Sequence, residues 1–313
     1  VLDDQGRPAE AFNAYAAAKA TLREAYAPVF AGQESVTARE LRLGAYLRRT
    51  EAVPVAAAAQ PRRQHVFLVG FPRSGTTLLE HVLSCHPDIE AMEERPCLID
   101  AALEFTGSDS AMDRFAALSD AGLEPWRQAY WRRAAEAGHR ASRPVFLDKL
   151  PLNLPFLPLI ARLFPRAKIL LALRDPRDVV LSCFRRRFAM NLGMFEFTSL
   201  QTTAAYYDAV MALMQVCAQK LALEIRQTRH ENLLADFDGE ARGLCGFLGL
   251  DFREDMRNFA ARAAARNIDT PSSAQVARGL TTAGAGQWRR YQAPLAPILP
   301  TLAPWVAHFG YPL

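Results

Sequence analysis

Short apolar runs alternate with amphipathic stretches from residue 66 to residue 248, and this alternation predicts most of the secondary structure. Four runs have the length of buried parallel strands, namely 66–70, 145–147, 168–173 and 223–228. Helices are predicted after the first run, over 155–164, after Pro176 and, beyond the last run, through 248. Strands that alternate with helices predict an α/β fold whose mainly parallel sheet is flanked by helices.

The helix after the first strand carries its apolar residues on one side, since Leu78, Leu79, Val82 and Leu83 share a face. Glu80, His81 and Ser84 fall off that face. We therefore expect these three side chains on the polar side of the helix.

The first 60 residues are rich in alanine and predict a short helical segment that begins near Pro8. It resembles the second helix of a tetratricopeptide repeat; a plain helical extension is the alternative. One repeat cannot bury its own apolar face, so it should cap the following domain or stack on further repeats. Residues 53–63 mix proline, alanine and charge as a linker does. We expect a repeat remnant with its linker at 1–60 and a catalytic domain at 61–313.

Composition narrows the class of protein. Half of the 313 residues are hydrophobic, and 37 basic against 33 acidic residues give a net charge of +4. This balance suits a small anionic ligand and is too mild for nucleic-acid binding. Five widely spaced cysteines and six histidines show no metal-ligand spacing, so we expect reduced thiols and no metal. With no apolar membrane span and no signal peptide, a cytoplasmic location is expected, and the start at Val1 indicates a fragment of a longer protein.

The most informative segment is the octapeptide at 70–77, Gly-Phe-Pro-Arg-Ser-Gly-Thr-Thr, which lies between a predicted strand and a predicted helix. Its glycines let the chain curl so that backbone N–H groups and the helix N-terminus can bind a phosphate, as in a P-loop. Thr76 stands where a nucleoside-triphosphate site has lysine. The loop is therefore predicted to bind a single phosphate, with Arg73 adding positive charge for a transferring group.

Four segments together resemble the superfamily of sulfotransferases that use 3′-phosphoadenosine 5′-phosphosulfate (PAPS). They are the loop at 70–77, the motif at 173–178 with Ser182, the segment at 229–233, and the C-terminal residues 272–276 with 287–291. The resemblance runs from about residue 62 to the end. The chain is most similar to bacterial proteins in which tetratricopeptide repeats precede a tyrosylprotein-sulfotransferase-like domain. This resemblance implies transfer of a sulfuryl group from PAPS to a hydroxyl acceptor, without a metal.

The resemblance assigns PAPS-binding roles to several residues. The 5′-phosphosulfate is expected at Arg73, Ser74, Gly75, Thr76 and Thr77. The 3′-phosphate is expected at Arg174 and Ser182, a guanidinium and a hydroxyl that suit phosphate oxygens. His230, Ser272 and Arg278 complete the predicted nucleotide contacts. Arg177 and residues 185–187 are interpreted as a solvated basic face.

The same resemblance implies that two further residues carry the chemistry. Lys149 would offset charge on the leaving phosphate, and Glu94 would accept the acceptor's proton. A surface lysine and a solvated acidic turn are the alternatives. His81 and His86 rank below Glu94 as bases, the first because of its expected polar helix side and the second because it precedes proline in a turn.

The chain also departs from the tyrosylprotein enzymes. Pro96 stands where an arginine would help to hold acidic peptides, although Arg95 is adjacent, and Gln287 replaces a lysine. The acceptor therefore stays open between protein tyrosine, glycan, lipid and small phenol, and a protein partner could bind the N-terminal segment. Phe105, Trp126 and Trp131 are candidates either for an acceptor site or for the core. A P-loop kinase and an inactive nucleotide-binding scaffold are the competing functions.

Overall fold

A computed structural model describes residues 2–51, 63–140, 142–265 and 279–312. The chain forms two compact units. One comprises residues 42–173 and 213–281, and the other residues 1–41, 174–212 and 282–313. Two helices, α2 (Val36–Arg49) and α10 (Leu200–Lys220), have residues in both.

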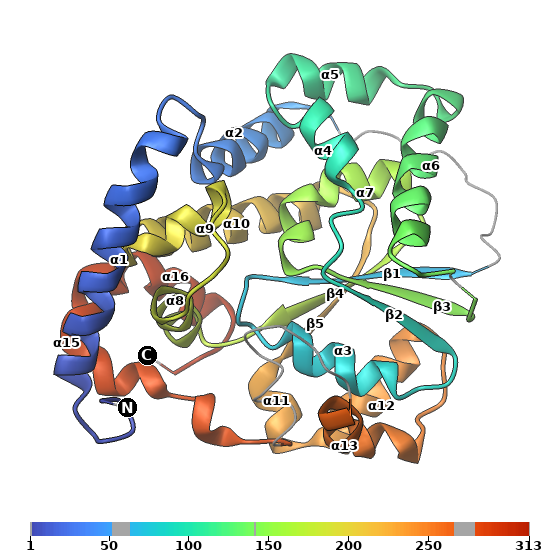
Figure 1. Cartoon of the computed structure of the whole chain (residues 1–313). Coiled ribbons are helices and arrows are strands. Elements are labelled where there is room, and N and C mark those ends of the chain that lie inside the picture. Colours follow the sequence, from blue (N-terminus) through green and yellow to red (C-terminus); the bar gives the residue numbers. More distant parts are fainter. Residues whose placement is uncertain (1, 52–62, 141, 266–278, 313) are drawn as a thin grey trace. The chain divides into compact units, whose positions relative to one another are not determined.

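The first unit is built on a five-stranded, all-parallel sheet in the order β2-β3-β1-β4-β5 (Figure 1). Its strands are β1 (Gln64–Gly70), β2 (Ile89–Glu93), β3 (Val145–Lys149), β4 (Lys168–Leu173) and β5 (Glu224–Arg229). The expected α/β class is confirmed, and β4 has the bounds that its apolar run predicts. β2 was not predicted, because two of its five residues are glutamates at the edge of the sheet.

Helices cover both faces of this sheet (Figure 1). On one face lie α3 (Thr76–Ser84), α11 (His230–Ala235), α12 (Phe237–Leu248) and α13 (Phe259–Ala265), and on the other α4 (Ile99–Phe105), α5 (Asp109–Ala117), α6 (Asp120–Glu136), η1 (Pro151–Phe156) and α7 (Leu157–Leu163). Alternating strand residues serve the two faces. Val66 and Leu68 pack with α3 and α12, whereas the ring of Phe67 lies against Tyr130 of α6.

Within its described residues, the second unit contains helices and no strand. Its helices are α1 (Pro8–Phe30), α8 (Pro176–Arg185), α9 (Leu192–Phe195), η2 (Glu196–Thr198), η4 (Thr282–Gly284), η5 (Gln287–Tyr291), α15 (Gln292–Leu295), η6 (Ala296–Ile298) and α16 (Leu299–His308). α1 begins at Pro8, as predicted, and packs on α8 through the rings of Phe12 and Phe184, 5.6 Å apart. The interpretation of residues 1–60 as a repeat remnant stays a prediction.

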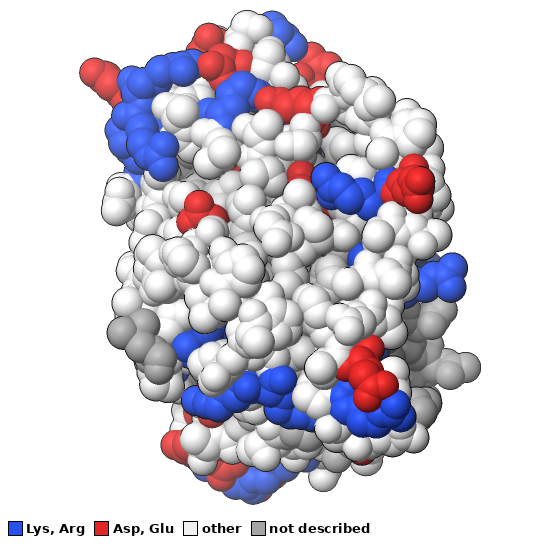
Figure 2. All heavy atoms as spheres, turned by 90° about the vertical axis from the view of Figure 1, so that its left-hand side faces the viewer, with Lys and Arg blue, Asp and Glu red and all other residues white. Residues whose placement is uncertain are grey.

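Surface charge, the cysteines and the hydropathy of the helices can be compared with the expectations drawn from composition. On the face drawn in Figure 2, basic and acidic side chains are interspersed among wide uncharged areas. All five cysteines are buried and free, as expected. Among the helices that the structure describes, none combines the length and the hydropathy that crossing a bilayer requires.

Candidate active site

The octapeptide at 70–77 forms a turn between β1 and α3, so the strand–loop–helix context is confirmed. Gly70 ends β1 where a Cβ would lie 2.6 Å from the carbonyl oxygen of Ala172 on β4, so only glycine lets the strands approach here. Gly75 caps α3 with a φ of 97°, a left-handed conformation that favours glycine. The helix begins at Thr76, which leaves its first N–H groups at the loop for an anion.

His230 lies against this loop. A Cβ on Gly75 would be 2.9 Å from Nδ1 of the imidazole, which stands at the start of α11. In the sequence, His230 is a candidate nucleotide contact only because it lies in the segment at 229–233. In the structure, its ring lies next to Gly75.

Arg73 and Glu94 share an unusual backbone conformation. Their φ angles are 73° and 45°, and they are the only non-glycine residues with positive φ among those that the structure describes. Such a conformation costs of order 1–3 kcal/mol and is concentrated at functional sites. The two residues that the sequence singles out as an anion contact and as a base are thus the two that the fold holds in strained backbone.

Lys149 is the last residue of β3 and has no exposed surface. Its ammonium lies 2.8 Å from Glu94, 3.3 Å from Glu93 and 3.8 Å from Glu80. The alternative of a surface lysine is therefore wrong. The three carboxylates hold the buried ammonium in a fixed position at the end of the strand.

The pairing of β2 with β3 creates this cluster. Glu93 is the register partner of Lys149, and the N–H of Glu94 donates to the Lys149 carbonyl over 2.7 Å. Glu94 lies just beyond the strand with 39% of its side chain exposed. A carboxylate that is anchored by its backbone and open to solvent can receive a proton from an incoming hydroxyl.

Glu80 is a member of this cluster that the sequence did not identify. The amphipathic pattern put Glu80 and His81 on the polar side of their helix, yet both side chains are buried, at 1% exposure. That expectation is wrong because α3 is enclosed on nearly all sides, as every residue from Thr76 to Leu83 is buried. The feature of the sequence that could have pointed to Glu80 is its place in the helix, four positions after the first helical residue.

His81 and His86 both lie in the interior. His86 is 2% exposed, its Nε2 lies 3.0 Å from the Asp251 carbonyl oxygen and its Nδ1 accepts the Asp88 N–H. Both ring nitrogens of His86 therefore already have backbone hydrogen-bond partners. Glu94, which is open to solvent, stays the preferred candidate base.

A second buried acid precedes Lys149. Asp148 accepts the Tyr130 hydroxyl over 2.7 Å and the Asn153 amide over 3.4 Å. Burial raises the pKa of Asp148 to about 7. Tyr130 also lies 2.9 Å from His65 Nε2, so three buried polar groups form one chain behind the lysine.

The residues predicted to bind the 3′-phosphate, Arg174 and Ser182, lie in the second unit. Arg174 follows β4 directly in the sequence; its guanidinium donates to the Gly284 carbonyl and lies 4.0 Å from Asp178. Asp178 also accepts the N–H groups of Gly286 and Trp288. Burial raises the pKa of this carboxyl above its ordinary value, although the Arg174 charge and the two N–H groups oppose the rise. Ser182 is half-buried on α8.

Part of the expected basic face is not solvated. Arg177 is 4% exposed, pairs with Asp175 at 2.8 Å and stacks 3.8 Å from the centre of the Trp288 ring. Arg185 pairs with Asp3 at 3.3 Å and bonds Gln287 at 3.2 Å. That interpretation is wrong for both residues, because the C-terminal segment packs over α8. Arg187 is exposed, as expected.

The remaining candidate residues for the nucleotide and acceptor sites lie either outside the described residues or away from the loop. Ser272 and Arg278 lie outside the described residues. Phe105 is core, 4% exposed and packed on Trp126 with ring centres 4.8 Å apart. Trp131 packs near the start of the strands, 5.2 Å from Phe146, whereas the loop lies at their ends.

The chain matches known proteins over most of its length. Residues 65–254 match the family model described as "Sulfotransferase family". An uncharacterised protein of Aquifex aeolicus is 27% identical over 251 residues, which is 77% of this chain, and mouse (Mus musculus) protein-tyrosine sulfotransferase 1 is 32% identical over 156 residues, or 48% of it. The chain spans only 32% and 41% of the length of these two relatives.

The fold is also found in a solved structure. The sulfotransferase domain of the Synechococcus PCC 7002 olefin synthase has a TM-score of 0.59 with 21% identity, and the match covers 85% of this chain and all of that domain. At this identity, the likeness concerns the fold.

Proposed function

We propose that this chain, which belongs to the sulfotransferase family, transfers a sulfuryl group from PAPS to a hydroxyl acceptor by metal-independent in-line displacement. The observation that carries the proposal is the cluster of Lys149 with Glu94 beside a phosphate loop that has no lysine. A triphosphate site needs that lysine and Mg²⁺, and a phosphosulfate needs neither in this scheme.

The loop is proposed to bind the 5′-phosphosulfate end. Backbone N–H groups from Gly75 to Thr77, at the start of α3, and the Ser74 hydroxyl supply donors, and Arg73 supplies charge. The left-handed φ values of Arg73 and Gly75 support this assignment, because a chain that turns this way directs successive N–H groups inward. His230 adds a side-chain donor beside Gly75.

In the proposed step, the acceptor oxygen attacks sulfur and gives its proton to Glu94. The bond between sulfur and the bridging oxygen breaks, and the electron pair stays on the leaving 3′,5′-adenosine bisphosphate. Lys149 offsets that charge, which is larger in the transition state than in the bound substrate. Because an ammonium has three donors, Lys149 can keep a carboxylate partner while it serves the leaving oxygen.

The 3′-phosphate is assigned to Arg174 and Ser182. The planar guanidinium of Arg174 is held by Asp178 and by the Gly284 carbonyl, which fixes its orientation. A fixed fork loses less freedom when it binds two phosphate oxygens. Ser272 and Arg278 stay sequence-based candidates for the same nucleotide.

A phenolic hydroxyl, such as that of protein tyrosine, is the acceptor we propose. The names of the curated relatives support it, and Glu94 suits a phenol because the proton leaves a weakly acidic oxygen. Pro96 in place of an arginine argues for an acceptor without the acidic flanks of a typical peptide substrate, with Arg95 as a substitute contact. A cytoplasmic location and a protein partner at the N-terminal segment remain proposals from the sequence.

Transfer of ³⁵S from labelled PAPS tests the proposal. The acceptors are 4-nitrophenol, a tyrosine peptide with acidic flanks, the same peptide with neutral flanks, and an alkyl alcohol, each with EDTA and with Mg²⁺. We expect transfer to the phenols, unchanged by EDTA, with the neutral peptide preferred over the acidic one. Phosphate transfer from Mg²⁺-ATP, with no transfer of ³⁵S, would instead indicate a kinase.

A further inference from the structure

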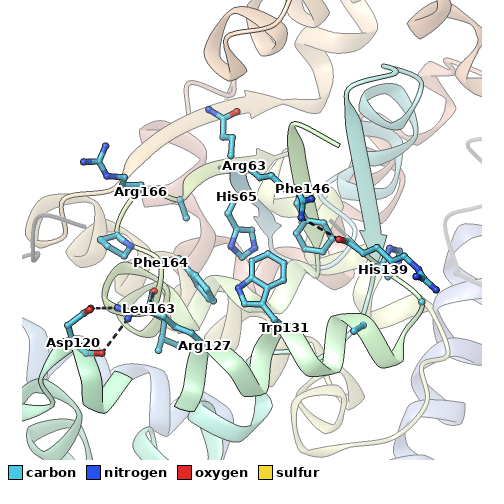
Figure 3. A pocket seen from close by; sticks show the side chains of 16 residues that line it. Arg63, His65, Asp120, Arg127, Trp131, His139, Phe146, Leu163, Phe164 and Arg166 are labelled. Atoms are coloured by element: carbon cyan, nitrogen blue, oxygen red, sulfur yellow. Dashed lines mark hydrogen bonds and ion pairs between the residues drawn. The ribbon is translucent and has the colours of Figure 1, made fainter. Parts of the chain in front are cut away.

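A cavity lies in the first unit, lined by the residues that Figure 3 draws. It is at the edge where the strands begin, whereas the phosphate loop follows the end of β1. The cavity has a volume of about 1130 Å³ and opens where β1, β3 and β4 begin, beside Gln64, Phe146 and Ala167. β1 runs from this cavity to Gly70, and seven residues of strand span about 20 Å. A ligand here cannot touch the transferring sulfur, so the cavity is separate from the proposed active site.

Aromatic side chains form one wall of the cavity. Figure 3 shows Trp131, Phe146, Phe164 and His65 gathered there. Ring centres lie 5.0 Å apart for His65 and Trp131 and 4.7 Å apart for His65 and Phe164. Trp131 is 37% exposed, an unusual exposure for a large apolar ring. Such a wall suits a planar, apolar ligand.

Arginines surround this wall. Arg63, Arg127, Arg140 and Arg166 line the cavity, and Asp120 is the one acidic residue among the lining residues that the structure describes. Asp120 is already paired with Arg127 at 2.6 Å. The lining therefore carries an excess of positive charge.

Two of these arginines, Arg63 and Arg140, have no carboxylate partner among the residues that the structure describes. Within the described ranges, no carboxylate lies within 4 Å of either guanidinium, and Arg63 contacts only the Arg140 carbonyl, at 3.5 Å. The nearest acid of β2, Glu90, is 3.6 Å from His139 and accepts the backbone N–H groups of Arg140 and Ser142. Two exposed guanidiniums beside an apolar wall attract an anion.

His65 does not add to this charge. Burial lowers the pKa of its imidazole to about 3, so the ring is neutral at physiological pH. Its Nε2 is engaged with the Tyr130 hydroxyl. The wall is thus apolar and uncharged at His65, and the permanent positive charge around it comes from the arginine side chains.

We propose that this cavity is a binding site for an aromatic monoanion, an aryl carboxylate or aryl sulfate. Its ring packs against Trp131, and its anionic group pairs with Arg63 and Arg140. An inorganic phosphate would leave the aromatic wall uncovered, and a neutral aromatic would leave the guanidiniums without a partner. The site does not depend on the proposed sulfuryl transfer.

The test uses 2-naphthoate and 2-naphthalenesulfonate as probes, and calorimetry and tryptophan fluorescence measure their binding. Neutral 2-methoxynaphthalene, which has no hydroxyl to accept a sulfuryl group, and inorganic phosphate are the comparison ligands. We expect one site per chain for both anions, binding at least tenfold weaker for the comparison ligands, and no competition from saturating 3′,5′-adenosine bisphosphate.

Variants locate the site. Arg63→Glu with Arg140→Glu should weaken 2-naphthoate at least tenfold, and the milder pair Arg63→Gln with Arg140→Gln serves if charge reversal impairs folding. Trp131→Phe should remove most of the fluorescence change. Arg132→Glu, an exposed neighbour on α6 outside the cavity, should change affinity less than twofold. Equal binding by the double variant and the wild type, or displacement of 2-naphthoate by the bisphosphate, would overturn the proposal.

Discussion

The ammonium of Lys149 lies 2.8 Å from a carboxylate oxygen of Glu94, although the two residues are 55 positions apart in the sequence. The parallel pairing of β2 with β3 brings them together, because Glu93 and Lys149 are register partners. The proposed proton acceptor and the proposed leaving-group cation are therefore direct neighbours. They should behave as one functional unit.

Glu94→Gln removes the proposed base and keeps the shape of the side chain. We expect kcat to fall by about 10²–10⁴-fold, the usual contribution of a general base, while affinity for 3′,5′-adenosine bisphosphate changes less than threefold. Steady-state transfer of ³⁵S and calorimetry give the two values. Glu93→Gln is the matched control, since Glu93 contacts the same ammonium at 3.3 Å, and it should cost less than tenfold. Wild-type kcat in the Glu94 variant would exclude it as the base.

Because Glu94 and Lys149 are in contact, their substitutions should not be additive. We expect Lys149→Met and Glu94→Gln each to lower kcat strongly, and the double variant to be within about tenfold of the weaker single variant. A full double-mutant cycle in transfer assays measures this. Multiplication of the two single effects would show that the residues act independently.

Gly75→Ala should damage the phosphate loop for two reasons. The φ of 97° is strained for alanine, at about 1–2 kcal/mol, and the added Cβ would lie 2.9 Å from His230 Nδ1. We expect a lower melting temperature and bisphosphate affinity at least tenfold weaker, as read by calorimetry. Gly246→Ala is the control, because a Cβ there meets nothing within 4 Å in α12 and should be neutral or slightly stabilising. Unchanged affinity in the Gly75 variant would remove the loop from the binding site.

Asp148 should make stability depend on pH. Burial raises its pKa from 3.8 to about 7, so the folded chain holds a proton that the unfolded chain has lost between about pH 4 and pH 7. The unfolding free energy should therefore fall as the pH rises through this interval, by up to about 1.4 kcal/mol per pH unit, and level off above it.

Asp148→Asn does not titrate and should lack this contribution. Urea unfolding of both proteins from pH 4 to pH 8 gives the difference in unfolding free energy, which should shift in favour of the variant as the pH rises. Parallel curves across the interval would contradict the buried, protonated state of Asp148.

The sequence predicted those parts of the fold that depend on local pattern. β4 is a continuous apolar run, and α8 begins at Pro176 after an aspartate that caps it, so both starts were readable. β2 was not, because a short edge strand with two glutamates lacks the apolar run of a central strand. Helices α4 to α6 lie in a stretch that carries no motif.

The sequence predicted which residues belong to the candidate site, but it did not predict how they are arranged in space. Arg73 and Lys149 were found because they follow predicted strands in recognisable segments, and Glu94 was found through the resemblance to tyrosylprotein sulfotransferases. Their φ angles and ion pairs depend on contacts between distant parts of the chain. Glu80 was missed for the same reason, since its burial follows from packing around α3 and not from its own helix pattern.

The most direct test of the central claim is a calorimetric titration with 3′,5′-adenosine bisphosphate, AMP and ATP, each with and without Mg²⁺. We expect metal-independent binding of the bisphosphate, with AMP at least tenfold weaker because it lacks the 3′-phosphate assigned to Arg174 and Ser182. Arg174→Gln should reduce the bisphosphate to the affinity of AMP. Binding of ATP only with Mg²⁺, without preference for a 3′-phosphate, would contradict the account.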